Sequence, residues 1–427
     1  MKQKFHLEAP HGLMNDPNGL CEFRRIYHVF FQWNPNEKNH SYKCWGHFTS
    51  KDFIHWQFLG KAIEPSESYD RCGTYSGSAC VIDDKFCLFY TGNNKIDGAR
   101  KSSQCIAESS DGKNFQKLGT IFETPKDFTE HFRDPKISFD GKNFKMIIGA
   151  QKKSGTGAIV QVDSTDGKNF QNLQILGESQ NFEMIECPDL IDFGTKKILL
   201  YGLQKRDNRI DKDISAESFY KIFNDSSLDN CRRIDSGFDF YAPQTFETSD
   251  GRKILFAWMS RLSESQEKFL ADRAENIHCL TMPREIFLNG DKLYQKPVRE
   301  MYKMLGDQIN SKMIPRSFYC KLEKNFARGF EIDFSDELKI VWTGQIFKFL
   351  RKDFSGLWQE KICELERLFE VEIWSDESSI EIFLNGGEFV LTARTFFDND
   401  FEVTSDEELK IFSINANDFF EDIKGEI

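Results

Sequence analysis

The sequence predicts an all-β protein in which a β-propeller is followed by a smaller β-sandwich. Two observations carry this prediction. Short strand-like runs, rich in aromatic and β-branched residues, recur through the first 300 of the 427 residues. Asp-Gly and Asn-Gly turns separate many of these runs, and such turns between strands are strong signals for β-hairpins. Meanders of this length favour radially repeated four-stranded sheets, although one large sandwich or barrel remains an alternative on the pattern alone.

The hairpin signal repeats. The pentapeptide Asp-Gly-Lys-Asn-Phe occurs three times, at residues 111–115, 140–144 and 166–170. We expect each copy to close a hairpin through a type I′ turn, because that turn needs two successive residues that tolerate φ > 0. The clearest strand-like runs of this part of the chain are residues 86–90, 145–148, 197–201 and 254–258.

The pattern changes near Pro297. Residues 298–311 are typical of a short helix or a linker, and strict alternation of apolar and polar residues then returns at 330–334, 369–373 and 380–384. Alternation of this kind predicts antiparallel strands with one solvated face. The predicted organisation is a propeller over residues 1–300, a linker over 301–312 and a β-sandwich over 313–427.

Composition restricts the classes of partner. The formal net charge of −12 disfavours nucleic acid and anionic membranes, while a small anionic substrate could still bind a local cluster of Lys and Arg. The N-terminus has no apolar segment of a secretory signal, and no apolar run has the roughly 18 residues of a membrane span. The eleven scattered cysteines are typical of reduced thiols. We therefore expect a cytoplasmic protein without a metal site, a disulfide framework or another cofactor.

The hexapeptide Met-Asn-Asp-Pro-Asn-Gly at residues 14–19 has the composition of a tight turn. Pro17 restricts its own φ and favours an extended conformation for Asp16, whereas Asn18 and Gly19 tolerate φ > 0. Such turns usually do no chemistry. This one is accompanied by two further acidic motifs that also contain proline, around Asp134 and Glu186.

Three carboxylates that lie far apart in the sequence can meet in a propeller, because the inner strands of its blades surround one axis. Two converging carboxyl groups suffice for glycoside cleavage: one attacks the anomeric carbon or activates water, and the other protonates the leaving oxygen. A third can hold sugar hydroxyls and keep the pKa values of the other two apart. Taken singly, each acidic motif fits a structural ion pair or a surface residue equally well.

An ordered set of motifs resembles glycoside hydrolase family 32, the invertase and sucrose-6-phosphate hydrolase family. The motifs run in family order across nearly the whole chain: Met-Asn-Asp-Pro-Asn-Gly at 14–19, Phe-Gln-Trp-Asn-Pro at 31–35, Trp-Gly-His at 45–47, Tyr-Ser-Gly-Ser at 75–78, Arg-Asp-Pro-Lys at 133–136, Glu-Cys-Pro-Asp at 186–189, Phe-Asp-Phe-Tyr-Ala-Pro-Gln at 238–244, Met-Pro-Arg-Glu at 282–285 and Asp-Glu-Ser-Ser-Ile-Glu-Ile-Phe-Leu-Asn-Gly-Gly at 376–387.

The resemblance implies a five-bladed propeller with a C-terminal β-sandwich and a retaining cleavage of terminal β-D-fructofuranosides. It implies Asp16 as the nucleophile, Glu186 as the general acid/base and Asp134 as the stabiliser of the transition state. It places nine further residues around the sugar subsites, with the indole faces of the two tryptophans against the sugar ring: Asn15, Gln32, Trp45, Tyr75, Ser76, Arg133, Cys187, Tyr241 and Trp258.

The substrate is left open at this level. Sucrose and sucrose 6-phosphate are the leading expectations, and a phosphate would need cations at the rim of the pocket, for which Lys43, Lys95, Arg100, Lys101 and Arg284 are equivalent candidates. The alternatives are hydrolysis of fructan oligomers, transfer of fructosyl to another sugar, and a carbohydrate-binding protein without catalysis. The sequence does not determine the oligomeric state, and a homodimer is one option.

Overall fold

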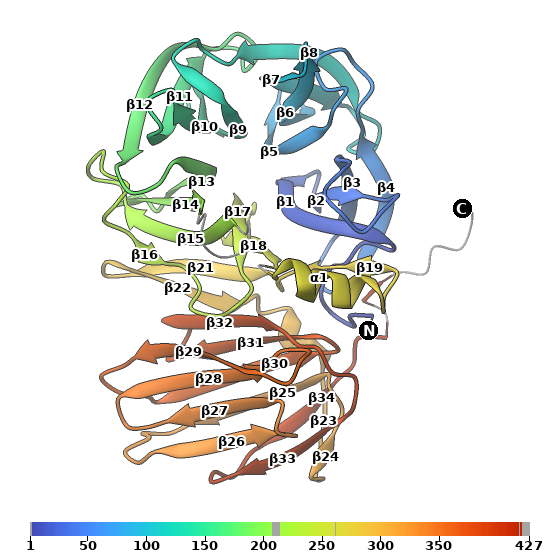
Figure 1. Cartoon of the computed structure of the whole chain (residues 1–427), viewed down its shortest axis with the longest axis vertical. Helices are drawn as coiled ribbons and strands as arrows, with labels where there is room; N and C mark the ends of the chain where they lie inside the picture. Colours follow the sequence, from blue (N-terminus) through green and yellow to red (C-terminus); the bar gives the residue numbers. More distant parts are fainter. Residues whose placement is uncertain (1, 207–213, 261, 418, 421–427) are drawn as a thin grey trace.

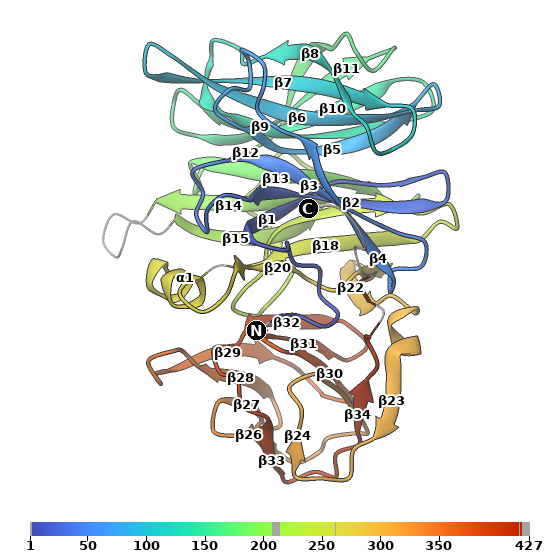
Figure 2. The same ribbon diagram turned by 90° about the vertical axis from the view of Figure 1, so that its right-hand side faces the viewer.

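Seven β-sheets hold nearly all the regular structure in the part of the chain that the computed structural model describes, residues 2–206, 214–260, 262–417 and 419–420. Five sheets follow one another in chain order around a central axis, and two six-stranded sheets form a second body beneath them (Figures 1 and 2). The predicted all-β class, with a propeller followed by a sandwich, is confirmed.

Each propeller sheet begins with the strand nearest the axis, and antiparallel neighbours follow outward. The first sheet contains β1 (Gly12–Phe23), β2 (Ile26–Asn34), β3 (Cys44–Ser50) and β4 (Trp56–Ile63), and β19 (Asn276–Ile277) runs parallel to β1. The second contains β5 (Thr74–Ile82), β6 (Lys85–Ile96), β7 (Ala99–Ser109) and β8 (Gln116–Glu123). The third contains β9 (Phe128–Phe139), β10 (Phe144–Lys152), β11 (Gly157–Ser164) and β12 (Gln171–Ser179).

The last two propeller sheets are less regular. The fourth contains β13 (Met184–Asp192), β14 (Lys197–Arg206), β15 (Ile214–Ile222) and the short β16 (Arg232–Arg233). The fifth contains β17 (Tyr241–Glu247), β18 (Lys253–Met259), β20 (Cys279–Leu280), β21 (Arg284–Asn289) and β22 (Lys292–Pro297). The helix α1 (Glu264–Ala271) stands between β18 and β19, and Ser263 caps its first turn. The four predicted strand-like runs all lie within strands, in β6, β10, β14 and β18.

Aromatic side chains fill the spaces between blades. Between the first two sheets, Phe30, Trp45 and Phe86 are fully buried in one cluster, and the ring centroids of Phe30 and Phe86 lie 5.8 Å apart. Burial of one such ring stabilises the fold by about 2–3 kcal/mol before entropy costs. Phenylalanines between the blades therefore help to hold the blades in register around the axis.

The three Asp-Gly-Lys-Asn-Phe repeats close hairpins, as predicted, but not through type I′ turns. Among the residues of these loops, only the glycines have φ > 0, for example Gly112 at 74°. Each aspartate side chain instead accepts hydrogen bonds from the two backbone N–H groups that follow the glycine; Asp111 Oδ1 accepts from Lys113 at 2.8 Å and from Asn114 at 2.9 Å. The loops are longer than two residues, so an Asx turn replaces the tight turn.

The second body consists of two sheets. One contains β23 (Leu305–Gln308), β34 (Ile411–Ile414), β25 (Phe318–Glu323), β30 (Glu370–Asp376), β31 (Ser379–Leu384) and β32 (Phe389–Arg394). The other contains β24 (Met313–Ile314), β33 (Phe401–Ser405), β26 (Phe330–Phe334), β27 (Leu338–Trp342), β28 (Ile346–Lys352) and β29 (Trp358–Glu364).

The connection between the two bodies is shorter than the linker that the sequence predicted. β22 still pairs with β21 in the fifth blade, whereas β23 already pairs with β34 of the sandwich. Only the 3-10 helix η1 (Met301–Met304) and the residues before it lie between them. We therefore propose the domain boundary at residues 298–304, a revision of the expected linker over 301–312.

Strands β30, β31 and β32 of one sandwich sheet have no solvated face, contrary to the expectation from the alternating sequence of β30 and β31. All six residues of β31 are buried, as are all but the first residue of β30 and of β32, and Glu381 is fully inaccessible. This sheet lies next to the propeller beside β21 and β22 (Figure 1), and Glu381 contacts Arg284 of β21. The alternation therefore marks an interface in which the carboxylates have buried partners. Of the three predicted alternating runs, the one in β26 has polar residues that are exposed or half-buried, as expected.

His6 and Arg284 form a buried clamp between the two bodies. His6 Nδ1 lies 2.9 Å from Asp376 and Nε2 lies 2.9 Å from Glu381, both on the sandwich. Arg284, on β21 of the propeller, donates to Glu381 at 2.8 Å and to Asp235 at 3.1 Å. Breaking a buried ion pair by removal of one partner costs several kcal/mol, because the other charge stays buried alone. The clamp therefore fixes the sandwich to the propeller.

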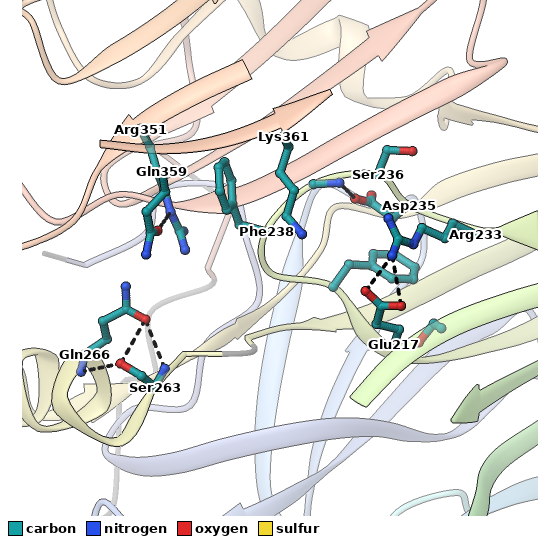
Figure 3. Close-up of a pocket in the computed structure, with 13 residues that line it drawn as sticks. Glu217, Arg233, Asp235, Ser236, Phe238, Ser263, Gln266, Arg351, Gln359 and Lys361 are labelled. Carbon is teal, nitrogen blue, oxygen red and sulfur yellow. Dashed lines mark hydrogen bonds and ion pairs between the residues drawn. The ribbon is translucent and has the colours of Figure 1, made fainter. Parts of the chain in front are cut away.

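Beside the clamp, a cavity of about 390 Å³ separates the propeller, α1 and the strands β28 and β29 (Figure 3). Its charged and amide side chains pair with one another: Glu217 accepts from Arg233 at 2.9 Å, and Gln359 accepts from Arg351 at 2.9 Å. None of the three predicted carboxylates lines it. This cavity is thus separate from the axial site.

The clamp predicts a pH-dependent stability. Burial lowers the pKa of His6, but its hydrogen bonds and charge interactions with Asp376 and Glu381 outweigh burial and raise the pKa to about 9. A raised pKa in the folded state adds stability that is complete below pH 6.5 and is lost as pH rises through about 9. We expect His6→Gln to lower the free energy of unfolding by roughly 3 kcal/mol more at pH 6 than at pH 9.5.

Urea unfolding at the two pH values measures this difference, and His11→Gln is the matched control because His11 is exposed and its ring contacts a backbone carbonyl and Trp33 but no carboxylate among the described residues. An equal cost of His6→Gln at both pH values would show that the clamp does not depend on the charge of His6.

Candidate active site

The five inner strands meet on the propeller axis. One narrow cavity is lined by residues of all five: Pro17 and Asn18 of β1, Ser76 and Gly77 of β5, Asp134 and Lys136 of β9, Cys187 and Pro188 of β13, and Ala242, Pro243 and Gln244 of β17. Residues that are more than 200 positions apart thus share one pocket wall, as a propeller predicts.

Each inner strand carries a register shift at this level. In β1 the pairing with β2 jumps between Met14 and Pro17, which leaves Asn15 and Asp16 opposite Gln32. Corresponding shifts occur in β5, β9, β13 and β17, at Ser76, Asp134, Cys187 and Ala242. Such β-bulges re-aim side chains and are frequent beside active sites. The hexapeptide at 14–19 is therefore not the tight turn that the sequence predicted; it lies inside the 12-residue strand β1.

Three of the bulges share an unusual backbone conformation. Asp134, Cys187 and Ala242 have φ values of 63°, 46° and 48°, and each directly precedes a proline. Consecutive side chains of a regular strand point to opposite faces. A left-handed residue at the bulge breaks this alternation, so Arg133 and Asp134 lie together, with Arg133 Nε 3.9 Å from Asp134 Oδ2. Strain of this kind persists where the surroundings hold it in place, and it clusters at functional sites.

Asp16 is held by neutral donors. Ser76 Oγ donates to its Oδ2 at 2.6 Å, and Asn15 Nδ2 donates to its Oδ1 at 3.1 Å. Asn15 is itself oriented by Lys43, whose ammonium donates to Asn15 Oδ1 at 2.5 Å. Both oxygens of the Asp16 carboxylate therefore have a donor, and its direction in the pocket is fixed.

Glu186 is held by two residues at equivalent positions of the flanking blades. Arg133 Nε donates to Glu186 Oε1 at 3.0 Å, and Tyr241 Oη donates to Oε2 at 2.5 Å. The Tyr241 ring can occupy this position because residue 202 is a glycine: a Cβ on residue 202 would lie 2.7 Å from the phenol oxygen. Both carboxylate oxygens of Glu186 are therefore oriented, and only 8% of this residue is exposed.

Asp134 lies between these two groups. Its Oδ2 accepts from the backbone N–H of Cys187 at 3.0 Å and lies 3.6 Å from the Cys187 thiol. Burial raises the pKa of Asp134 to about 7; Arg133 opposes this, and the Glu186 and Asp16 carboxylates add to it. A site with three carboxylates thus keeps one proton near neutral pH, which is the state that an acid catalyst requires.

The remaining predicted residues differ in how far they are buried. Tyr75 and Trp258 are half-buried, with Arg100 stacked 4.8 Å above the Tyr75 ring. Trp45 is fully buried in the core and donates its indole N–H to the Tyr75 carbonyl at 3.1 Å, so it offers no face to a sugar. Gln32 is 1% exposed and donates to the Thr74 carbonyl at 2.9 Å. These two expectations are wrong for direct contact, and both residues instead support the wall of the site.

Arg133 and Cys187 contact different carboxylates of the site. The Arg133 guanidinium donates to Glu186, and the Cys187 thiol contacts Asp134. Burial raises the pKa of this thiol well above its usual value, so it stays protonated and can act as a weak donor.

Sequence reasoning missed three contributors. Gly202 carries no motif, and only its packing against Tyr241 reveals its use. Lys43 was one cation among several candidates, and His40 was not considered, yet their side chains contact each other at 2.9 Å beside Asn15. Their spacing of three residues directly before Trp45-Gly46-His47 was the only available signal.

The arrangement supports nucleophilic attack combined with proton transfer. It offers one carboxylate with neutral donors, a second carboxylate that is oriented on both oxygens, and a third that holds a proton. Within the described residues, no group of His, Cys, Asp and Glu side chains is arranged to hold a metal ion. Two carboxylates and a bound water are sufficient for displacement at an acetal carbon.

Comparisons with known proteins agree with this chemistry. Residues 6–297 match the model for the glycosyl hydrolases family 32 N-terminal domain, and residues 345–424 match the model for the glycosyl hydrolases family 32 C terminal. The chain is 36% identical to the sucrose-6-phosphate hydrolase of Bacillus subtilis, over 95% of this chain and 91% of that protein. It is 34% identical to the one from Klebsiella pneumoniae, over 92% and 88%.

Solved structures are similar over the whole chain. The sucrose-6-phosphate hydrolase from Lactobacillus gasseri superposes with a TM-score of 0.86 at 26% identity, covering 97% of this chain and 93% of that one. The GH32 β-fructofuranosidase of Bombyx mori superposes with a TM-score of 0.85 at 25% identity, covering 99% and 95%.

The contact between Tyr241 and Glu186 predicts a catalytic role for the phenol. We expect Tyr241→Phe to lower kcat/KM for sucrose by roughly 10- to 100-fold, because one oxygen of the acid/base loses its donor. Gly202→Ala should lower it in the same direction, since the added methyl displaces the ring. The control is Tyr220→Phe, a buried tyrosine of the neighbouring fourth blade whose hydroxyl accepts from Leu293 N–H. Equal activities of Tyr241→Phe and wild type would contradict the assignment.

The shared proton predicts a carboxyl group that titrates far from its usual range. In the free protein, one aspartic acid should lose its proton with a midpoint near pH 7, whereas an ordinary aspartate does so near 3.8. Carbon-13 NMR of labelled aspartate carboxyls measures this, and Asp134→Asn should remove the signal. If every aspartate were ionised by pH 5, the proton would not reside on Asp134.

Proposed function

The chain belongs to glycoside hydrolase family 32, and we propose from this that it is a β-fructofuranosidase that hydrolyses sucrose or sucrose 6-phosphate by double displacement. The support from the sequence is the identity of 31–36% to proteins named sucrose-6-phosphate hydrolases over almost the full chain. The support from the site is one observation: Asp16, held by Ser76 and Asn15, and Glu186, held by Arg133 and Tyr241, are oriented on the inner strands of the first and fourth blades in one site with Asp134.

The first displacement begins with the fructosyl unit above Asp16. The ionised Asp16 carboxylate attacks the anomeric carbon while the bond to the glucosyl oxygen breaks. Glu186, oriented by Arg133 and Tyr241, protonates that oxygen, so the leaving group departs as a neutral alcohol. The product is an ester between fructose and Asp16. Its formation needs Glu186 protonated and Asp16 ionised at the same time, so the proton that Asp134 holds in the free protein passes to Glu186 when the sugar binds, and Asp134 becomes a carboxylate.

The second displacement reverses these roles. The ionised Glu186 takes a proton from water, and the water oxygen attacks the anomeric carbon and releases the Asp16 carboxylate. Because the carbon is inverted twice, the fructose keeps its configuration. Asp134 supports both steps: its carboxylate accepts hydrogen bonds from fructosyl hydroxyls, and these bonds strengthen as positive charge develops on the ring.

The other parts of the proposal follow from this chemistry. Neither displacement uses a cofactor or a metal ion. A small sugar is the proposed partner, and the net charge of −12 supports the absence of nucleic acid and anionic membrane from the list of partners. No helix among the described residues has the length and apolarity to cross a bilayer. We propose the cytoplasm as the location because a phosphorylated sugar is an intracellular metabolite.

A covalent fructosyl–Asp16 ester is the observation that tests the mechanism. Glu186→Gln keeps the shape of the site but cannot exchange a proton, so both steps slow, and an activated fructoside with a good leaving group should load the enzyme faster than water unloads it. Mass spectrometry of the peptide with residues 14–19 should then show one added fructosyl unit. Asp16→Asn is the matched control and should show none.

The alternative outcomes are clear. An adduct on another carboxylate would move the nucleophile away from Asp16. Sucrose cleavage at the wild-type rate in both variants would contradict the mechanism and would favour hydrolysis by other groups.

A further inference from the structure

Lys43 is a buried ammonium group without a carboxylate partner. Only 8% of the residue is exposed, and among the described residues no carboxylate oxygen lies within 4.0 Å of its Nζ. Its two hydrogen-bond partners are the amide oxygen of Asn15 and a ring nitrogen of His40, at 2.5 and 2.9 Å. Burial of a charge is costly unless the charge is paired. An ammonium has three donors, so one N–H is left for a ligand.

The other candidate cations are less suited to an anionic group. Arg284 is fully buried in the clamp with Glu381 and Asp235. Lys101 pairs with Glu123 at 3.1 Å, and Lys95 is exposed near the end of β6. Arg100 stacks on Tyr75 and donates to Asn93 at 2.9 Å. Lys43 is thus the candidate that hydrogen-bonds Asn15, which in turn donates to the Asp16 carboxylate.

Lys43 lies in the direction in which the glucosyl unit of a bound substrate would extend from the catalytic carboxylates. His40 and Lys43 lie on the connection between β2 and β3. The His40 ring is 6.0 Å from the Trp258 ring, and Trp258 is 6.5 Å from Tyr241, which donates to Glu186. A glucosyl unit whose bridging oxygen is at Glu186 and whose ring lies over Trp258 therefore extends toward His40 and Lys43.

Trp258 adds a second unused donor on this wall. Its indole N–H is buried and has no hydrogen-bond partner among the described residues. A buried polar group without a partner is costly, and a ligand oxygen would satisfy it. The wall therefore presents one cation and one neutral donor, a set that suits an acceptor-only group with several oxygens.

We propose that Lys43, oriented by His40, and the indole N–H of Trp258 bind the phosphate on C6 of the glucosyl unit and so make the enzyme prefer sucrose 6-phosphate over sucrose. This inference rests on the proposed β-fructofuranosidase activity. A phosphate monoester offers three acceptor oxygens and close to two negative charges at neutral pH. Lys43 supplies the charge, and His40 orients its ammonium through one ring nitrogen at 2.9 Å, while the other ring nitrogen of His40 faces Glu267 at 4.0 Å. Charge-assisted hydrogen bonds of this type are among the strongest in proteins.

A second role for Lys43 must be separated from this one. Its charge also interacts with Asp16, and through Asn15 it orients the nucleophile. If that were its whole function, its loss would impair every fructoside equally. If it also binds the phosphate, its loss would impair substrates that carry one more than substrates that do not. The ratio of the two specificity constants distinguishes the roles.

The experiment measures kcat/KM for sucrose and for sucrose 6-phosphate in wild type, Lys43→Met and the control Lys95→Met. Methionine keeps the length and burial of the side chain without its charge. We expect Lys43→Met to lower kcat/KM for both substrates, because Lys43 orients Asn15, but to lower that for sucrose 6-phosphate roughly 20- to 100-fold more than that for sucrose. Lys95→Met should change neither value. His40→Gln should lower the preference in the same direction.

Product inhibition of sucrose cleavage gives an independent measurement. Glucose 6-phosphate should inhibit wild type more strongly than glucose or fructose 6-phosphate does, and Lys43→Met should abolish that difference. A stronger effect of fructose 6-phosphate would place the phosphate on the fructosyl side and overturn the proposal. An equal loss of both activities in Lys43→Met, or an unchanged preference, would overturn it as well. Wild type without activity on either substrate would instead refute the proposed function, and sucrose cleavage by wild type keeps the two failures distinct.

Discussion

The site depends on a closed ring of polar contacts that joins the five inner strands just below the carboxylates. Each contact links one blade to the next: Gly77 N–H donates to Asn18 at 3.2 Å, and Ser78 Oγ donates to the Pro135 carbonyl at 2.7 Å. Asp189 pairs with Lys136 at 3.0 Å and accepts from Thr245 N–H at 2.8 Å. Leu20 N–H donates to Gln244 at 3.2 Å, which closes the ring. Side-chain donors and acceptors in a buried ring fix the strands relative to one another far better than apolar packing does, because hydrogen bonds are directional. The ring thus sets the spacing of groups that come from different blades.

The β-bulges of the five inner strands bring the functional side chains together in one pocket. Because the register shifts at the same level in all five inner strands, residues at equivalent positions of neighbouring blades become partners, as Arg133, Glu186 and Tyr241 do. A left-handed residue before proline then brings its own side chain to the same side as that of the preceding residue, as Arg133 and Asp134 show. The resulting site has three carboxylates, with Arg133 and Lys43 as neighbouring cations. Burial and the charges of Glu186 and Asp16 raise the pKa of Asp134, so a proton is retained near neutral pH. Acid catalysis here follows from the geometry of the blades.

Much of this could be predicted from the sequence, and the failures have common physical causes. The strand-like runs, the hairpins and the three carboxylates were accessible because they depend on local patterns and on a resemblance carried by motifs. Trp45 was misplaced because a tryptophan at a strand centre packs equally well in a core or against a sugar, and only the three-dimensional neighbours decide. The alternation in β31 was interpreted as a solvated face, although Glu381 meets Arg284 across an interface between domains. Gly202, His40 and Lys43 act through contacts between distant segments, and no short pattern encodes those. The clamp of His6 and Arg284 holds the sandwich against the propeller, and this contact supports a role for the sandwich as a brace of the propeller.

The configuration of the first released fructose tests the central claim most directly, which is that Asp16 and Glu186 act as nucleophile and acid/base from separate bulged strands. Rapid NMR of the anomeric signals during the first moments of sucrose cleavage, before mutarotation equilibrates the product, distinguishes the two possible outcomes. Two displacements at one carbon predict that β-D-fructofuranose appears first. Initial release of the α-anomer would mean a single displacement by water, and Asp16 would then be a base and not the nucleophile.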